Sequence, residues 1–167
     1  MNVLSLLQPW ASLVVLGHKK IETRSWNTKY RGELLIHASA KKVSPKMELT
    51  DAFAANYGKL QLFDGIPSMF DLPLGAIIGK AILIDVVTSE WFYQFASNGI
   101  SNIEQEQAFG DYSPNRFLWI LHNPVLFKEP IPCKGQLGIW NFDVEHEIKR
   151  QEMVSNLDNV ELLKQIN

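Results

Sequence analysis

The sequence has few features of secreted, disulfide-bonded or membrane-spanning proteins. It has a single cysteine, Cys133, so no internal disulfide can form, which fits a reducing cytoplasm. Lys80 and Asp85 interrupt the apolar stretch from Leu74 to Val87, so no segment is long enough to span a bilayer. The first residues lack a cationic segment followed by a long apolar one, so no secretory signal is expected. We therefore expect a cytoplasmic protein without a membrane anchor.

Metal-binding patterns and repeats are also missing. The four histidines are scattered and nothing has the Cys/His spacing of a metal site, so no metal ligand and no cofactor is predicted. We find no internal repeat, low-complexity tract or convincing linker. A length of 167 residues with 46% hydrophobic residues favours one globular domain with its own core.

Positive charge is scarce outside one N-terminal segment. Residues 17–46 hold eight of the sixteen Lys and Arg residues, namely Lys19, Lys20, Arg24, Lys29, Arg31, Lys41, Lys42 and Lys46. Of the eighteen acidic residues, only Glu22 and Glu33 fall there. Because the net charge is −2, this concentration of cations predicts a local site for an anion rather than non-specific binding to long duplexes.

Strand and helix patterns follow one another irregularly. We expect strands at residues 3–6, 20–26, 32–38, 75–88, 116–122 and 135–142. We expect helices from Gln8-Pro9 to Leu16, from Ser44 to Gly58 and from Ser89 to Ala96, followed by a charged helical tail from Val144. Gly79 is expected to mark a β-bulge. Without a βαβ rhythm, this order favours an α+β domain around a small mixed or antiparallel β-barrel.

Five ordered blocks of sequence resemble the ASCH family, named for the activating signal cointegrator homology domain. The blocks span residues 4–13, 17–26, 30–38, 112–119 and 134–140, and include Gln8-Pro9-Trp10, Gly17-His18-Lys19-Lys20-Ile21-Glu22-Thr23-Arg24, Tyr30-Arg31-Gly32, Tyr112-Ser113-Pro114-Asn115-Arg116 and Gly138-Ile139-Trp140. The resemblance covers about residues 3 to 142. It therefore implies an ASCH domain at residues 1–142 and a C-terminal helical extension at residues 143–167.

This resemblance implies a PUA-like β-barrel with flanking short helices and a cleft bounded by residues 17–24. Family members are proposed to bind RNA or other nucleic acids. Some small members hydrolyse acylated cytidine nucleosides, and others are reported as ribonucleases. Because one fold hosts several activities, the fold does not choose between them.

Lys19, Glu22 and Arg24 are the first candidates for a site. Residues 22 and 24 share one face of the expected strand, and Lys19 enters from the turn before it, which places a carboxylate between two cations. One interpretation is a structural ion-pair cluster that fixes the turn. The other is a binding pocket in which Lys19 and Arg24 hold a phosphate or a base carbonyl while Glu22 accepts a hydrogen bond from an exocyclic amine.

Lys19 and Glu22 are also catalytic candidates. In the acylcytidine hydrolases that the chain resembles, the position of Glu22 carries a threonine nucleophile, which the lysine matching Lys19 activates. A carboxylate changes that mechanism, so the remaining hydrolytic option is Glu22 as a general base on water. The second carboxylate of those enzymes has no secure counterpart, although Glu104 and Glu106 lie in about the right region.

Further ligand-binding candidates lie around the same blocks. They are Gln8 beside a helix start, Trp26 as a stacking surface, Arg31, Lys41 and Lys42 as phosphate contacts, and Ser113 and Arg116 in a family block. Core packing is the alternative for Trp26, and a solvated helix start explains the two lysines equally well. Trp10, Trp119 and Trp140 are expected in the core.

The sequence thus predicts a protein that binds single-stranded RNA, a nucleotide or a modified nucleoside in a basic cleft. The enzymatic alternative is a nucleoside amidohydrolase of the N4-acylcytidine type or a metal-independent ribonuclease in the same pocket. A third alternative is an interaction module in transcription or RNA metabolism, with a protein partner bound by the C-terminal helix.

Overall fold

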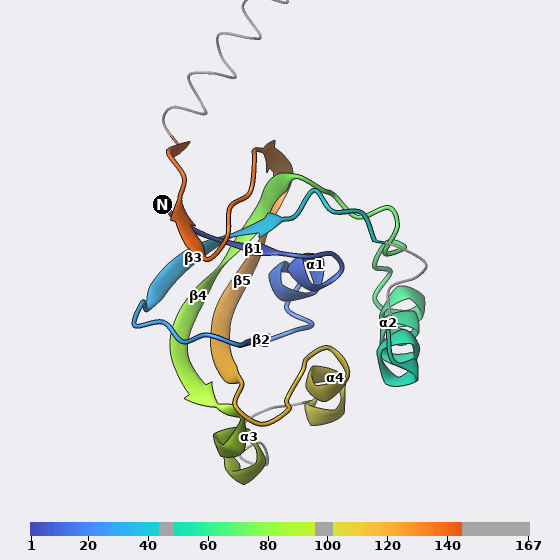
Figure 1. Cartoon of the computed structure of the whole chain (residues 1–167). Helices are drawn as coiled ribbons and strands as arrows, with labels where there is room; N and C mark the ends of the chain where they lie inside the picture. Colours follow the sequence, from blue (N-terminus) through green and yellow to red (C-terminus); the bar gives the residue numbers. More distant parts are fainter. Residues whose placement is uncertain (44–48, 96–101, 145–167) are drawn as a thin grey trace, which may run out of the picture.

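The computed structural model describes residues 1–43, 49–95 and 102–144, and these residues form six strands and four helices (Figure 1). The strands are β1 (Asn2–Leu6), β2 (Ile21–Arg24), β3 (Gly32–Ala38), β4 (Ala76–Thr88), β5 (Phe117–Pro132) and β6 (Ile139–Asn141). The helices are α1 (Trp10–Val15), α2 (Asp51–Phe63), α3 (Ser89–Phe95) and α4 (Ile103–Ala108). This irregular mixture of strands and short helices confirms the predicted α+β class.

All six strands belong to one curved sheet. Their order is β2-β5-β4-β3-β1-β6, in which β1 and β3 are parallel and the other neighbours are antiparallel. Within the described residues β2 and β6 form the two edges, so the sheet is open and the predicted closed barrel is not confirmed. A side chain links two strands that are not neighbours in the sheet, because Nη2 of Arg24 in β2 donates to the carbonyl of Ser5 in β1 at 3.0 Å.

The main core lies between the sheet and α1, which sits in the hollow of the curved strands (Figure 1). α1 approaches β4 closely at Gly79. A Cβ at Gly79 would lie 2.2 Å from the carbonyl oxygen of Val125 and 2.7 Å from the side chain of Val15, so only glycine fits there. The pairing of β4 with β5 changes register between Ile77 and Gly79, which confirms the predicted bulge.

A second core fixes α2 and the end of α4 beside α1. Phe53 of α2 stacks on Tyr57 at 5.9 Å and meets the edge of Phe109 at 5.0 Å between ring centroids. Leu13 of α1 and Leu60 of α2 belong to the same buried cluster. This cluster places α2 and the residues after α4 next to the turn between α1 and β2.

Several element boundaries differ from the prediction, and the strand predicted at residues 135–142 is shorter, because β6 spans only Ile139–Asn141. The predicted helix start at Ser44 lies outside the described residues, and the predicted end at Gly58 is wrong because α2 continues to Phe63. Glycine costs about 1 kcal/mol inside a helix, whereas burying a leucine such as Leu60 contributes roughly 1.5–3 kcal/mol. β5 continues past residue 122 to Pro132. Among residues 1–43, 49–95 and 102–144, no strand pairs with the outer side of β5 beyond Ile120, and such an edge tolerates proline.

α4 was not predicted, and the C-terminal tail is not covered. α4 begins where the side chain of Asn102 accepts a hydrogen bond from the amide of Gln105 at 3.2 Å. The helix predicted from Val144 lies outside the described residues apart from its first residue, so the domain boundary at 142 stays a prediction. None of the described helices is long and apolar enough to cross a membrane.

Candidate functional site

The turn between α1 and β2 is held from the side by α4. Gly17 ends the helical segment with a φ of +81°, a conformation that glycine adopts readily. Nε2 of Gln105 donates to the carbonyl of His18 at 2.7 Å. The carboxylate of Glu106 accepts hydrogen bonds from the backbone amides of Lys20 and Ile21, the latter at 3.2 Å. A helix about 85 residues away in sequence thus fixes the start of β2.

Glu106 and Lys19 form a buried pair of opposite charge beneath this turn. Glu106 is 3% exposed and Lys19 is 1% exposed. Burial raises the pKa of Glu106, although the Lys19 ammonium and the amides of Lys20 and Ile21 oppose the rise. Burial likewise lowers the pKa of Lys19, against the effect of the carboxylates of Glu22 and Glu106.

Lys19 is directed toward the start of β2 rather than toward solvent. Its Nζ donates to the carbonyl of Ile21 and lies 3.9 Å from Oε2 of Glu22. Lys19 does not line the pocket described below. Its ammonium therefore supports Glu22 from behind and does not present a free cation to a ligand.

Glu22 and Arg24 project from the same face of β2, as the strand period predicted. Nε of Arg24 lies 3.2 Å from Oε1 of Glu22, and Glu22 stands between Arg24 and Lys19. Because Nη2 of Arg24 also binds the carbonyl of Ser5, the guanidinium has a fixed position. The structure thus confirms the predicted carboxylate between two cations.

A pocket of about 440 Å³, which we call the Glu22 pocket, opens beside this group. Its lining residues come from β1, α1, β2, α2 and the loop after α4. They are Leu6, Leu7, Trp10, Glu22, Thr23, Arg24, Leu49, Thr50, Phe53, Ala108, Phe109, Gly110, Asp111 and Arg116. Trp10 and Phe53 contribute an aromatic wall with ring centroids 5.6 Å apart, and Nε1 of Trp10 donates to the carbonyl of Phe109 at 2.9 Å. The volume is in the range typical of small-molecule sites, roughly 300–1,000 Å³.

The loop from Gly110 to Arg116 forms the rim of the Glu22 pocket. The amide of Asp111 donates to Oγ1 of Thr23 at 3.1 Å, which ties the loop to β2. Nε of Arg116 donates to Oδ2 of Asp111 at 2.8 Å, and the amide of Ser113 donates to Oδ1 at 3.0 Å. Hydrogen bonds from Ser113, and then the bond and charge of Arg116, lower the pKa of Asp111. The loop is thus held in one conformation by its own carboxylate.

Three predicted ligand-binding residues lie together. Glu22, Arg24 and Arg116 line the Glu22 pocket, and Lys19 lies behind it. Their charges do not make a strongly basic cleft, because the lining carries the carboxylates of Glu22 and Asp111 beside the two arginines. Of the eight cations in residues 17–46, Arg24 alone lines this pocket among the described residues, and Lys46 is outside them.

Other predicted residues lie elsewhere. Nε2 of buried Gln8 donates to Oγ of Ser12 and to the carbonyl of Pro73, both at 2.8 Å, and holds α1 to the loop before β4. Trp26 packs edge-on against Trp119 at 4.7 Å, consistent with its core interpretation.

The remaining candidates are spread over the surface. Arg31 pairs with Asp85 at 2.9 Å, and neither residue lines the Glu22 pocket. Lys41 and Lys42 are exposed and do not line it either. Ser113 lines a second pocket on the other side of the loop.

Sequence reasoning missed most of the residues that line the Glu22 pocket, including its aromatic wall and Asp111. Trp10 was expected in the core, but it is only partly buried and forms a pocket wall. Phe53, Phe109 and Asp111 were not singled out, although Asp111 directly precedes the family block at residues 112–119. Within the described residues, no three His, Cys, Asp or Glu side chains are grouped to hold a metal ion.

Comparison with known proteins adds to this geometry. A family model described as "ASCH domain" matches residues 4–131. "Activating signal cointegrator 1" of Homo sapiens is 37% identical over 142 residues and that of Mus musculus is 36% identical, and each match covers 84% of this chain. The chain spans only 22% of the length of these relatives. The crystal structure of ASCH from Zymomonas mobilis is 16% identical, with a TM-score of 0.49, over 92% of this chain and 93% of that chain.

Proposed function

Because this chain belongs to the ASCH domain family, we propose that it binds single-stranded RNA or a nucleotide in the Glu22 pocket. The observation that carries the proposal is the make-up of this pocket, in which an aromatic wall faces hydrogen-bonding and charged groups. Proteins commonly bind unpaired bases by stacking them on aromatic rings and by hydrogen bonds to the base edges. Family members are proposed to bind nucleic acids, which supports the same assignment.

Each side of the Glu22 pocket has a distinct role in this proposal. Trp10, the partly exposed ring of the aromatic wall, stacks a base, and buried Phe53 packs against it. Glu22, whose carboxylate is held by Lys19 and Arg24, accepts a hydrogen bond from an exocyclic amine. Arg116 at the rim contacts a phosphate, for which its fork of N–H donors is suited.

The PUA-like barrel that the family resemblance implies belongs to this proposal. So do the cytoplasmic location and the interaction role in transcription or RNA metabolism. The name "Activating signal cointegrator 1" describes proteins of which the chain spans about a fifth, so their activity comes to this chain only as a proposal. A protein partner for residues 143–167 stays a prediction, because most of that segment lies outside the described residues.

Hydrolysis in the same pocket is the second candidate. The observation in its favour is that the Glu22 carboxylate lines the pocket, where it is able to activate a water molecule as general base. Lys19 is not free to act on a ligand, because its Nζ is buried and bound to the carbonyl of Ile21. In this chain the catalytic role predicted for Lys19 therefore reduces to positioning Glu22.

A gel-shift experiment with end-labelled, single-stranded RNA, at low and moderate salt and without added metal, tests the proposal. We expect a shift that weakens with salt. Arg116→Gln should lower the affinity by about 10-fold, since a charge-assisted hydrogen bond contributes roughly 1.5–3 kcal/mol. Arg31→Gln is the matched variant, because Arg31 also pairs with a surface aspartate but does not line the pocket.

The same lanes distinguish the alternatives. Equal loss of affinity in Arg31→Gln and Arg116→Gln would contradict binding in the Glu22 pocket, and it would support the sequence-based prediction for Arg31. Cleavage that disappears in Glu22→Gln would favour hydrolysis, for which loss of the base costs roughly 10²-fold or more. Absence of both shift and cleavage would refute RNA binding and leave nucleotides and modified nucleosides to be tested by the same variants.

A further inference from the structure

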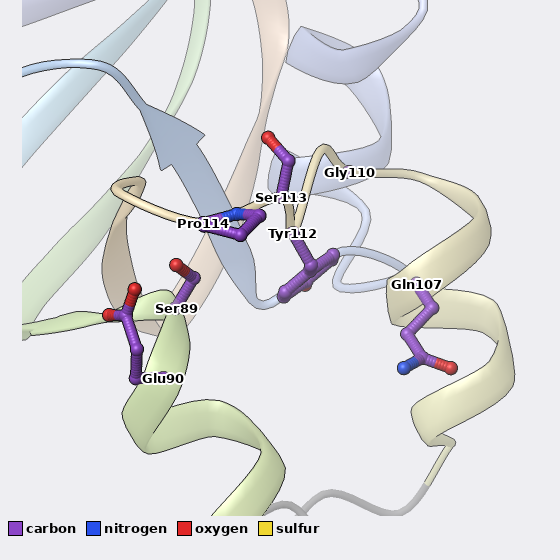
Figure 2. A pocket seen from close by; sticks show the side chains of 7 residues that line it. All are labelled: Ser89, Glu90, Gln107, Gly110, Tyr112, Ser113 and Pro114. Atoms are coloured by element: carbon purple, nitrogen blue, oxygen red, sulfur yellow. The ribbon is translucent and has the colours of Figure 1, made fainter.

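A second pocket of about 520 Å³ lies on the other side of the loop from Gly110 to Arg116 (Figure 2). It is formed by the start of α3, the end of α4 and the loop itself. Figure 2 shows Glu90 of α3 and Gln107 of α4 on opposite sides of this space, with the ring of Tyr112 between them. This volume is also typical of a site for a small organic group, roughly 300–1,000 Å³.

The walls of this second pocket are held by hydrogen bonds and packing. Oγ of Ser89 accepts from the amide of Arg116 at 3.3 Å, and Oε1 of Glu90 accepts from the amide of Asn115 at 3.2 Å. Tyr112 is 7% exposed and packs against Phe92 at 4.4 Å between ring centroids. The pocket thus has a fixed aromatic floor between two anchored walls.

The chemistry of the second pocket favours a neutral group that carries hydrogen-bond donors. Its lining offers the carboxylate of Glu90 and the amide of Gln107, beside the rings of Tyr112 and Pro114. No lysine or arginine lines it within the described residues, so a phosphate would meet one carboxylate and no cation. A sugar with free hydroxyls and a base with a flat face and amino groups suit this lining.

The two pockets adjoin each other. Gly110 lines both of them. Arg116 links them as well, because its side chain lines the Glu22 pocket while its backbone amide binds Ser89, which lines the second pocket. A phosphate group between two bound nucleosides would pass the shared residue Gly110 and lie near the Arg116 guanidinium, which lines the Glu22 pocket.

We propose that the second pocket binds the nucleoside next to the one in the Glu22 pocket, so that the ligand is a single-stranded oligonucleotide of at least two nucleotides. This inference rests on the proposed function of the Glu22 pocket and makes it more specific. A mononucleotide would occupy the Glu22 pocket and leave the second pocket empty. An oligonucleotide would gain the contacts to Glu90, Gln107 and Tyr112 in addition.

The test compares the affinities of each nucleoside 5′-monophosphate and the matching single-stranded RNA trinucleotide for the full chain. We expect the trinucleotide to bind at least about 10-fold more tightly. Gln107→Glu places a second carboxylate in the pocket and should weaken trinucleotide binding roughly 5-fold, while the mononucleotide affinity stays unchanged. Gln107→Leu, which removes the hydrogen-bonding amide without adding a charge, should act in the same direction. Gln61→Glu on the exposed side of α2 is the matched control, since it adds the same charge away from both pockets.

The outcomes separate this inference from the proposed function. Equal affinities for the two ligands, or a trinucleotide advantage that Gln107→Glu and Gln107→Leu leave intact, would overturn the second binding site and keep the proposed function. Binding of neither ligand would overturn both. Thermal unfolding of each variant identifies any affinity loss that comes from a damaged fold. If one of the two pocket variants is destabilised, the affinities measured for the other variant decide the test.

Discussion

Replacing Glu106 should destabilise the protein far more than a surface substitution does. Its carboxylate accepts hydrogen bonds from the amides of Lys20 and Ile21, and Lys19 carries the nearby positive charge. In Glu106→Leu both amides lose their acceptor at a cost of about 1–3 kcal/mol each, so the free energy of unfolding should fall by about 2–6 kcal/mol. Glu106→Gln keeps one acceptor oxygen and should cost about 1–3 kcal/mol. Because small domains unfold with roughly 5–15 kcal/mol in total, the larger loss should be easy to measure.

Urea unfolding followed by tryptophan fluorescence measures these changes, since Trp119 is fully buried in the main core. Glu104→Gln is the matched control on the same helix. Glu104 is exposed, and its replacement should change the free energy of unfolding by no more than about 0.5 kcal/mol. If Glu106→Gln and Glu104→Gln unfold at the same urea concentration, α4 does not hold the start of β2 as we argue. A large fall in the free energy of unfolding would show that the turn carrying Lys19 and Glu22 depends on α4, a helix that is distant in sequence.

Two further predictions concern other parts of the fold. His37 is buried, its Nδ1 has no hydrogen-bond partner among the described residues, and burial lowers its pKa against the opposing bond to the carbonyl of Cys133. The folded-state pKa of His37 therefore lies below its unfolded-state value of about 6.5, and the neutral ring favours the folded state above that pH. This contribution to the free energy of unfolding is lost as the pH falls through the folded-state pKa, by at most about 1.4 kcal/mol per pH unit. NMR titration of the His37 ring checks this, and a midpoint at or above pH 6.5 would show the reasoning to be wrong. Gly110→Ala should destabilise the protein by about 1–3 kcal/mol in urea unfolding, because overpacking is costly in a well-packed region. Its Cβ would lie 2.7 Å from the ring of Tyr112 and 3.1 Å from the methyl of Thr23, and unchanged stability would mean that the loop moves freely.

The sequence by itself determined the local features of the candidate site. The two-residue period of a strand was enough to place Glu22 and Arg24 on one face, and the turn before the strand was enough to bring Lys19 beside them. The same reasoning found most strands and the bulge at Gly79, because apolar alternation and glycine placement are properties of neighbouring residues. The family blocks identified the domain, and the match over residues 4–131 confirms the family.

Only the tertiary structure decided which distant residues complete the site. Phe53, Glu106 and Asp111 are far in sequence from Glu22, and no local pattern shows that α2, α4 and the following loop pack against the same turn. The same limit applies to the cations, since Arg31 pairs with Asp85 on another strand while Arg116 reaches the pocket rim. A strand period fixes the face on which a side chain lies, but the partner that it meets there depends on sheet order and helix packing. For that reason the concentration of Lys and Arg residues in one segment was predictable from the sequence. Which of these cations reach the Glu22 pocket was not.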